Sequence, residues 1–129
     1  MDKFETHVDE HGIVNMAIKG RVRREVWDQF KKWIEDTQKI IKEEYDKTGK
    51  KVRATVDLTD TSSQYDSDTI AALASFTKAN EPYMEKTATF GANTMIKFAE
   101  DLVITISGRK NIKAFATKDE ATKWLLSEK

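Results

Sequence analysis

The chain of 129 residues has no cysteine, a single proline and two histidines. Without cysteine it has no disulfide framework, no thiolate nucleophile and no cysteine-ligated zinc. His7 and His11 are near each other in the sequence, but no third ligand accompanies them, so we expect solvated side chains and no metal site. The motifs of serine hydrolases and phosphate-binding loops are also missing. The sequence therefore predicts a protein that is not an enzyme and uses no cofactor.

An excess of charge of one sign is missing as well, because 22 Lys and Arg balance 22 Asp and Glu. Nucleic-acid binding draws on a surplus of Lys and Arg, so we expect no nucleic-acid partner. The apolar runs are a few residues long, whereas a membrane-spanning helix needs about 20. The N-terminal residues lack the apolar core of a signal peptide. We expect one cytoplasmic domain, residues 1–129, without a membrane span.

The spacing of apolar residues predicts strands where its period is two and helices where its period is 3.6. Strands are predicted at residues 4–8, 14–18, 52–58, 86–90 and 112–116. Helices are predicted at residues 21–47, 66–79 and 94–107, and a last one starts at the Thr-x-x-Glu capping box of residues 117–120. The first two strands form a hairpin. Strands that alternate with helices pair in parallel through right-handed crossovers.

The predicted strands alternate apolar with polar residues, whereas parallel strands that are covered on both sides have continuous apolar runs. We therefore expect an α/β fold in which a mixed, mostly parallel five-stranded sheet carries four helices mainly on one face. The other face would be exposed and would carry polar side chains such as Arg53, Thr55 and Thr87. In the helix at residues 94–107, one apolar face is expected to hold Met95, Ala99, Leu102 and Ile106.

A family resemblance appears in two segments. Residues 66–73, Asp-Ser-Asp-Thr-Ile-Ala-Ala-Leu, resemble the Asp-Ser-Ser-Gly-Leu-Gly-x-Leu signature of STAS domains, and residues 56–59 are similar to the strand end that precedes it. Residues 113–125 are similar to the Phe, Glu-Ala and Trp-Leu ending of the SpoIIAA-like, or STAS/SEC14-like, family. The resemblance implies a SpoIIAA-like βα superhelix and a bacterial regulatory module that binds a protein partner. Its SEC14-like side implies an alternative, a carrier or sensor of a small ligand such as a lipid or an anion.

The same resemblance implies a regulatory or partner-binding site at Asp66, Ser67, Asp68 and Thr69. In the antagonists of this family the second serine of the motif is phosphorylated, and Asp68 holds that position here. A kinase cannot switch a permanent carboxylate, which puts the phosphorylation switch in doubt. Asp68 also suits the first turn of a helix on dipole grounds alone, so helix capping is the competing interpretation.

A second candidate site follows from the expected topology. In parallel α/β sheets, ligands favour the crevice beyond the carboxyl ends of the strands, where helix N-termini offer free amides. The residues that could hold a small anion there are Thr59, Ser62, Ser63, Gly91, Asn93 and Thr94. Ordinary loop and capping roles are the competing interpretation.

The first predicted helix exceeds the length of the sheet. At 1.5 Å per residue, roughly 26 residues extend about 39 Å, and a five-residue strand spans less than half of that. An overhanging half would expose Ile40, Ile41 and Tyr45. Such an apolar patch predicts a homodimer, and the alternative is a break near Asp36 and Thr37 that folds the last turns back onto the domain.

Overall fold

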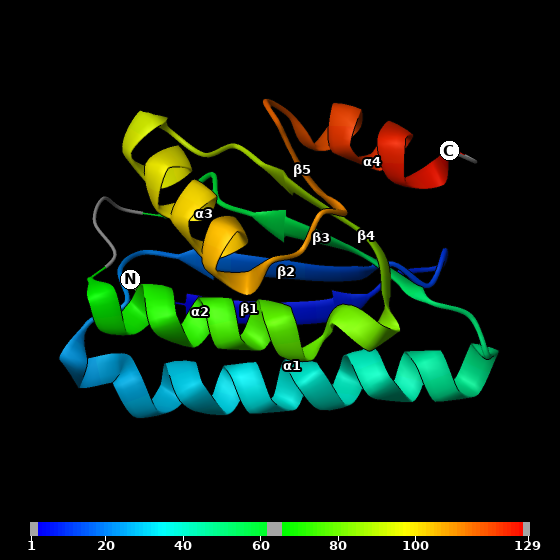
Figure 1. Cartoon of the computed structure of the whole chain (residues 1–129), viewed down its shortest axis with the longest axis horizontal. Coiled ribbons are helices and arrows are strands. Elements are labelled where there is room, and N and C mark those ends of the chain that lie inside the picture. The colour runs from blue at the N-terminus through cyan, green and yellow to red at the C-terminus, as the bar shows by residue number, and fades with distance from the viewer. Residues whose placement is uncertain (1–2, 62–65, 128–129) are drawn as a thin grey trace.

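The computed structural model describes residues 3–61 and 66–127. Within these ranges five strands and four α-helices alternate, as the sequence predicts (Figure 1). They are β1 (Lys3–Val8), β2 (Val14–Lys19), α1 (Trp27–Thr48), β3 (Val52–Asp57), α2 (Ser67–Ala79), β4 (Met84–Phe90), α3 (Thr94–Ser107), β5 (Ile112–Phe115) and α4 (Lys118–Leu126). Short 3-10 turns at Arg24–Val26 and Glu81–Tyr83 precede α1 and β4.

The strands form one sheet in the order β1-β2-β3-β4-β5. β1 pairs with β2 in the antiparallel sense, and the other neighbours pair in parallel. The predicted hairpin and the mixed, mostly parallel sheet are therefore confirmed. Because β2 to β5 run in the same direction, the loops that follow β3 and β4 lie at one edge of the sheet.

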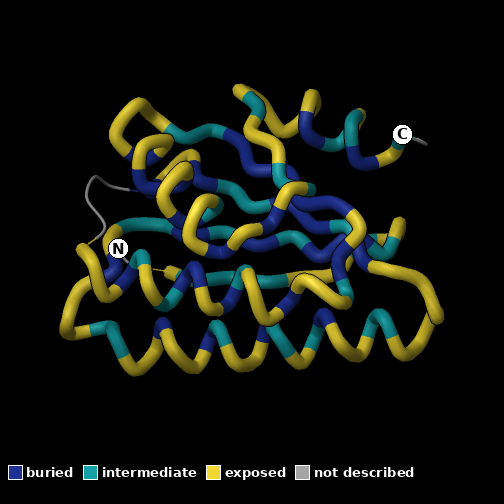
Figure 2. Tube along the Cα trace, in the orientation of Figure 1, coloured by how far each residue is buried: buried dark blue, intermediate teal, exposed yellow. Residues whose placement is uncertain are grey.

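Helices α1, α2 and α3 cover one face of the sheet, and the main core lies beneath them (Figures 1 and 2). Phe30 and Ile41 of α1 are fully buried against residues such as Val14 and Met16 of β2. The stripe of α1 also contains Trp33, whose Nε1 donates a hydrogen bond to Thr6 Oγ1 at 2.8 Å. The regular spacing of these side chains along α1 orients the helix against the sheet.

Helix α4 packs on the opposite face. Thr87 and Thr89 of β4 line a cavity on the side of α2 and α3, so the alternate residues Ala88 and Phe90 point the other way, where they pack with α4. Three of the four helices thus share one face, as predicted, but the expectation that the other face is exposed is wrong. Thr55 on that other face is 3% exposed. Its burial is possible because its hydroxyl donates to Asn15 Oδ1 at 2.6 Å.

Two cations on this second face hold the C-terminal end of α4. Lys86 Nζ donates to the carbonyl oxygens of Trp124 at 3.0 Å and Ser127 at 3.1 Å. Arg53 Nη1 donates to the carbonyl oxygen of Leu125 at 2.5 Å. A helix C-terminus leaves carbonyl groups unpaired and attracts positive charge. The polar residues of the alternating strands therefore bind a helix end on this face instead of contacting only solvent.

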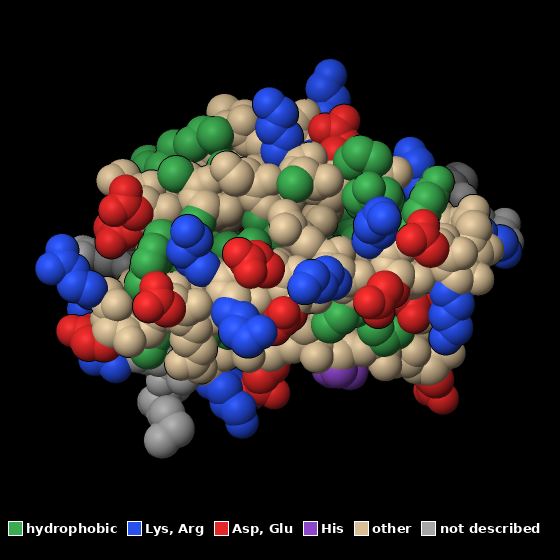
Figure 3. All heavy atoms as spheres, turned by 90° about the horizontal axis from the view of Figure 1, so that it is seen from below, with side chains coloured by type: hydrophobic (Ala, Val, Ile, Leu, Met, Phe, Trp, Pro, Cys, Tyr) green, Lys and Arg blue, Asp and Glu red, His purple; other side chains and the backbone are tan. Residues whose placement is uncertain are grey.

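Helix α1 is covered along its length, so the expectation of an overhanging apolar patch is wrong. Ile41 is 0% exposed, and Ile40 is partly buried against the main core. The ring of Tyr45 packs edge-on against that of Tyr83, with centroids 5.3 Å apart. The 3-10 turn that carries Tyr83 covers a part of α1 that the strands are too short to reach. The expectation of an overhang considered only the length of the strands and so left this turn out. The basis for a homodimer through these residues is lost, and opposite charges are interspersed over the surface of α1 (Figure 3).

Helix α3 has apolar side chains on two faces. Its buried face holds Ile96, Ala99, Glu100 and Val103, and much of the rest of the helix is exposed (Figure 2). The exposed side chains are large and hydrophobic: Met95 (55% exposed), Phe98 (73%), Leu102 (42%) and Ile106 (60%). Met95, Leu102 and Ile106, expected on one apolar face, are thus all exposed, whereas Ala99, expected on the same face, is buried. Among the helices in the described ranges, none is long and apolar enough to cross a membrane.

Candidate functional site

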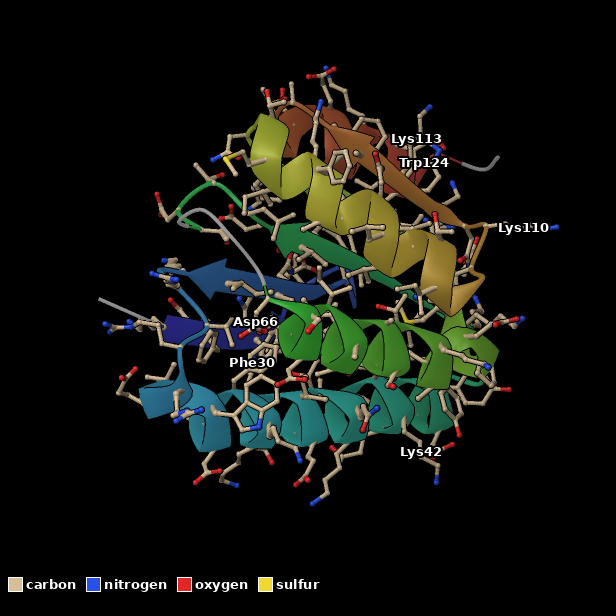
Figure 4. The ribbon with its side chains drawn as sticks, turned by 60° about the vertical axis from the view of Figure 1, so that its left-hand side comes forward. Phe30, Lys42, Asp66, Lys110, Lys113 and Trp124 are labelled. Atoms are coloured by element: carbon tan, nitrogen blue, oxygen red, sulfur yellow. The ribbon has the colours of Figure 1, made fainter. Side chains whose placement is uncertain are left out.

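The first candidate site lies at the N-terminus of α2, where Figure 4 labels Asp66. Asp66 has extended backbone and is the N-cap residue, because its Oδ1 accepts a hydrogen bond from Thr69 N at 2.8 Å. This hydrogen bond lowers the pKa of the Asp66 carboxyl group. A carboxylate at this position satisfies a backbone amide that the helix leaves free. The cap therefore fixes where the first turn of α2 begins.

The other three residues of the motif fall in that first turn. Ser67 and Asp68 are both exposed, whereas Thr69 is fully buried. Asp68 lies in the first turn, as the capping interpretation predicts, but the side chain that caps the helix is that of Asp66. Together with the exposed cap residue Asp66, the start of α2 thus presents one hydroxyl and two carboxylates to solvent.

The second set of candidates lies at the carboxyl ends of β3 and β4, which are joined by a hydrogen bond from Leu58 N to Phe90 O at 3.0 Å. Gly91 has a φ of +81°, and a Cβ added there would collide with Thr59 Oγ1. Thr59 therefore occupies the space that Gly91 leaves open. Asn93 is the N-cap of α3, and its Oδ1 accepts from Ile96 N at 2.9 Å.

Ser62 and Ser63, two further anion candidates, lie outside the described residues. Thr94, which follows the cap, is exposed and lies in the first turn of α3. The structure therefore separates the second set of candidates. Thr59 packs against Gly91, Asn93 caps a helix, and Thr94 faces the neighbouring helix α2 across a groove.

That groove joins the two candidate sites. One hollow of about 480 Å³ is lined by Arg21, Val22, Asp66, Ile70, Thr94, Met95, Phe98, Ala99 and Leu102. A second hollow of about 490 Å³ is lined by Ser67, Ile70, Ala71, Ala74, Ser75, Lys78, Leu102 and Ile106. Ile70 and Leu102 line both hollows, so we treat the two as one feature, the α2–α3 groove. The start of the STAS-like motif lies at one end of this groove.

A smaller cavity of about 90 Å³ lies between the sheet and helices α2 and α3. Its lining is mainly apolar but includes Glu100 and Arg109. Glu100 forms a hydrogen bond with the hydroxyl of Thr89, and burial raises the pKa of its carboxyl group. An engineered cavity of about 150 Å³ holds one benzene molecule, so this cavity cannot hold a long acyl chain.

The SpoIIAA-like family model matches residues 13–126. The chain belongs to the SpoIIAA-like family. No curated protein sequence matches this SpoIIAA-like chain.

Two solved structures resemble this SpoIIAA-like chain over most of its length. An anti-sigma factor antagonist from Mycobacterium paratuberculosis has a TM-score of 0.64 and 12% identity, covering 98% of this chain and 96% of that one. The anti-sigma factor antagonist SpoIIAA in its unphosphorylated form has a TM-score of 0.62 and 13% identity, covering 95% of this chain and 96% of that one. At such low identity the likeness establishes the fold, and it confirms the predicted fold class.

Sequence reasoning located the motif of this SpoIIAA-like protein at the start of α2 but missed the groove beside it. The decisive residue is Phe98, which is 73% exposed. Its spacing of three residues from Met95 and four from Leu102 is a helical signal that was available in the sequence. This signal could not tell an exposed stripe from a buried one, because the other side of α3 is apolar too.

Proposed function

We propose that this SpoIIAA-like protein is a non-catalytic regulatory module that binds a protein partner along the α2–α3 groove. The observation that carries the proposal is the exposed stripe of Met95, Phe98, Leu102 and Ile106. Monomeric soluble proteins rarely expose a contiguous apolar patch of more than a few hundred Å², and patches above that size mark interaction sites. The two structural neighbours are anti-sigma factor antagonists, which supports regulation through binding.

The shape of the groove favours an amphipathic helix as the bound element. On its α2 side, Ala71, Ala74 and Ser75 are small and leave room between the two helices. On its α3 side, large apolar residues recur at intervals of three or four. Helix-in-groove recognition uses anchors with this same spacing on the partner. We therefore expect the partner to insert an apolar helix face between α2 and α3.

Two exposed residues of the motif, Ser67 and Asp68, lie at the end of this proposed interface. Ser67 lines the groove, and Asp68 follows it in the first turn of α2. A partner helix lying in the groove would therefore approach a negative charge at this end. In this proposal Asp68 contributes a fixed carboxylate to partner recognition. We further propose that the module acts in the bacterial cytoplasm, where a chain without cysteine needs no oxidising compartment.

The experiment is affinity capture from native cells with three tagged proteins: the unmutated chain, Phe98→Glu and Leu126→Glu. Leu126 is the matched control because it is also a large apolar residue at the surface, 47% exposed, but lies on α4. We expect a copurifying protein to be lost with Phe98→Glu and retained with Leu126→Glu. Circular dichroism verifies that both variants are folded. Equal capture by all three proteins would contradict the proposal, as would loss caused equally by the two substitutions.

A captured protein must then bind purified chain directly. Isothermal titration calorimetry with the identified partner, or with its predicted amphipathic helix as a peptide, measures the affinity. Phe98→Glu would place a charge in an apolar contact and should weaken binding at least tenfold, because burying an unpaired charge costs more than the roughly 1.4 kcal/mol that corresponds to a tenfold change in affinity. Ala71→Trp, which fills the groove from its α2 side, should weaken binding too, and it leaves residues 66–69 unchanged.

A further inference from the structure

The α2–α3 groove has a direction, because the two helices that line it run the same way (Figure 1). Thr94 and Met95 at the start of α3 line the hollow that contains Asp66, the N-cap of α2. Ile106 near the end of α3 lines the hollow that contains Lys78 near the end of α2. The N-termini of both helices therefore lie at one end of the groove, and their C-termini lie at the other.

The charged side chains differ between these two ends. Of the described residues that line the groove, Arg21, Asp66 and Lys78 are the charged ones. Arg21 and Asp66 share the first end, where the pKa of Asp66 is lowered by its hydrogen bond from Thr69 N and further by the charge of Arg21. Asp68 adds a second exposed carboxylate there, and the exposed Lys78 lies at the other end. The first end thus holds more negative than positive groups, and the second end holds a cation.

Asp68 and Lys78 form no ion pair within residues 3–61 and 66–127. Both charges are therefore available to a bound helix. Such a helix has a positive N-terminus and a negative C-terminus, and it is stabilised by acidic residues in its first turn and basic residues in its last turn.

These end charges distinguish the two directions in which a helix could lie in the groove. An antiparallel helix brings its negative C-terminus to the positive N-termini of α2 and α3, and it brings the basic side chains of its last turn to Asp68. Its acidic first turn then meets Lys78. A parallel helix with the same end charges would place acidic residues next to Asp68 and basic residues next to Lys78, and like charges repel.

We infer that the partner segment is an amphipathic helix that lies antiparallel to α2 and α3, with acidic residues in its first turn beside Lys78 and basic residues in its last turn beside Asp68. This inference rests on the proposed function and adds the direction and the charge pattern of the bound helix. Ser67 and Lys78 are 11 residues apart, about 17 Å along α2, so the contact covers about three turns of the partner.

The direction is measured with a spin-labelled model peptide, which is practical because the protein itself has no cysteine. The peptide has about 18 residues, capped ends, leucines at intervals of three and four, glutamates in its first turn and lysines in its last turn. A nitroxide at its C-terminal end should broaden the amide NMR signals of Ser67, Asp68 and Thr94. A nitroxide at its N-terminal end should broaden those of Lys78 and Ile106. The reverse pattern, or equal broadening at both ends of the groove, would overturn the inference.

The charge pattern is tested with a second peptide in which the glutamates and lysines exchange places. Fluorescence anisotropy at low ionic strength should show about three- to tenfold tighter binding of the first peptide, and added salt should reduce this preference. Asp68→Lys combined with Lys78→Glu should reverse the preference. Different helicities of the two free peptides cannot cause a reversal, because the same peptides are used with both proteins. An unchanged preference in this double variant would contradict the inference.

Lys97→Glu combined with Asp101→Lys is the matched control. These two residues are exposed on α3 but line neither hollow, and the exchange keeps the net charge of the protein the same. The control should keep the preference of the unmutated protein, and circular dichroism verifies that both double variants are folded. Equal changes in the two double variants would assign the preference to the overall charge distribution and not to the ends of the groove.

Phe98→Glu distinguishes a failure of this inference from a failure of the proposed function. If Phe98→Glu abolishes peptide binding but the peptides bind in both directions, the groove remains the docking site and the inference alone is wrong. If neither peptide binds, or if Phe98→Glu leaves binding unchanged, the groove does not bind a helix and the proposed function fails with the inference.

Discussion

Helices α1 and α3 both carry long apolar stripes, yet the protein covers the stripe of α1 and leaves one side of α3 exposed. Helix α1 packs against β1, α2 and the 3-10 turn that carries Tyr83. Helix α3 packs mainly against α2, its Glu100 bonds to Thr89 of the sheet, and Phe98 on its outer side remains 73% exposed. The exposure of an apolar stripe therefore depends on which elements flank the helix and not on the length of the helix.

The largest effect should come from comparing phenylalanines at the two helices. Phe30 of α1 is 0% exposed and Phe98 of α3 is 73% exposed. Phe30→Ala should lower the free energy of unfolding by about 3–5 kcal/mol, because it empties a packed core position. Phe98→Ala should change it by less than about 0.5 kcal/mol. Urea denaturation of both variants measures the difference, and similar losses would show that the outer side of α3 is covered in the folded protein.

A smaller effect is expected at the start of α3. Asn93 caps this helix, whereas no side-chain hydrogen bond caps α1 at Val26. Asn93→Ala should therefore lower the free energy of unfolding by about 1 kcal/mol, because Ile96 N loses its acceptor. Asn93→Asp keeps an acceptor and is the matched control. If Asn93→Ala is neutral, packing alone fixes the position of α3, as it does for α1.

The elements of the fold could be predicted from sequence because their signals are local. Gly108 ends α3 in the left-handed conformation, with a φ of +75°, and Thr117 caps α4 by accepting a hydrogen bond from Glu120 N. Both signals involve residues within four positions of the helix end. The position of the motif at the start of α2 was predictable for the same reason.

The inward face of α3 could not be predicted, because its burial depends on a distant residue. Glu100 lies on the buried face, where the hydroxyl of Thr89 on β4 supplies its hydrogen bond. Without that partner a glutamate marks the outer face of a helix, and the sequence offers no sign of the pairing. The burial of Lys86 by the C-terminal end of α4 is non-local in the same sense. The α2–α3 groove and the cavity beside Arg109 depend on such contacts and were missed.

The buried acid of α3 gives a prediction that depends on pH. Burial raises the pKa of Glu100 above its ordinary value of 4.5, so the folded protein retains a proton that the unfolded chain releases. The stability of the protein should therefore fall as the pH rises from the ordinary pKa towards the raised one. Glu100→Gln has no titrating carboxyl group at this position, so its free energy of unfolding should not show this decrease. The variant should therefore become more stable relative to the unmutated protein as the pH rises.

Urea denaturation at a series of pH values between about 4 and 7 tests this prediction. Glu43→Gln is the matched control, because Glu43 is an exposed glutamate on another helix, α1. The control should follow the unmutated protein over this window. Parallel pH profiles for the unmutated protein and Glu100→Gln would contradict the assignment of a raised pKa to this buried group.

The smallest effect on stability is expected at Asp68. Its exposed carboxylate is not the helix cap, so Asp68→Ala should change the free energy of unfolding by less than about 0.5 kcal/mol. Asp66→Ala should cost about 1 kcal/mol, because Thr69 N loses its acceptor. Thermal or urea denaturation separates the two. If Asp68→Ala is neutral in stability but weakens capture of the partner, its charge belongs to the interface at the end of the α2–α3 groove. Destabilisation equal to that of Asp66→Ala would instead support the capping interpretation and leave Phe98 to carry the proposed interface alone.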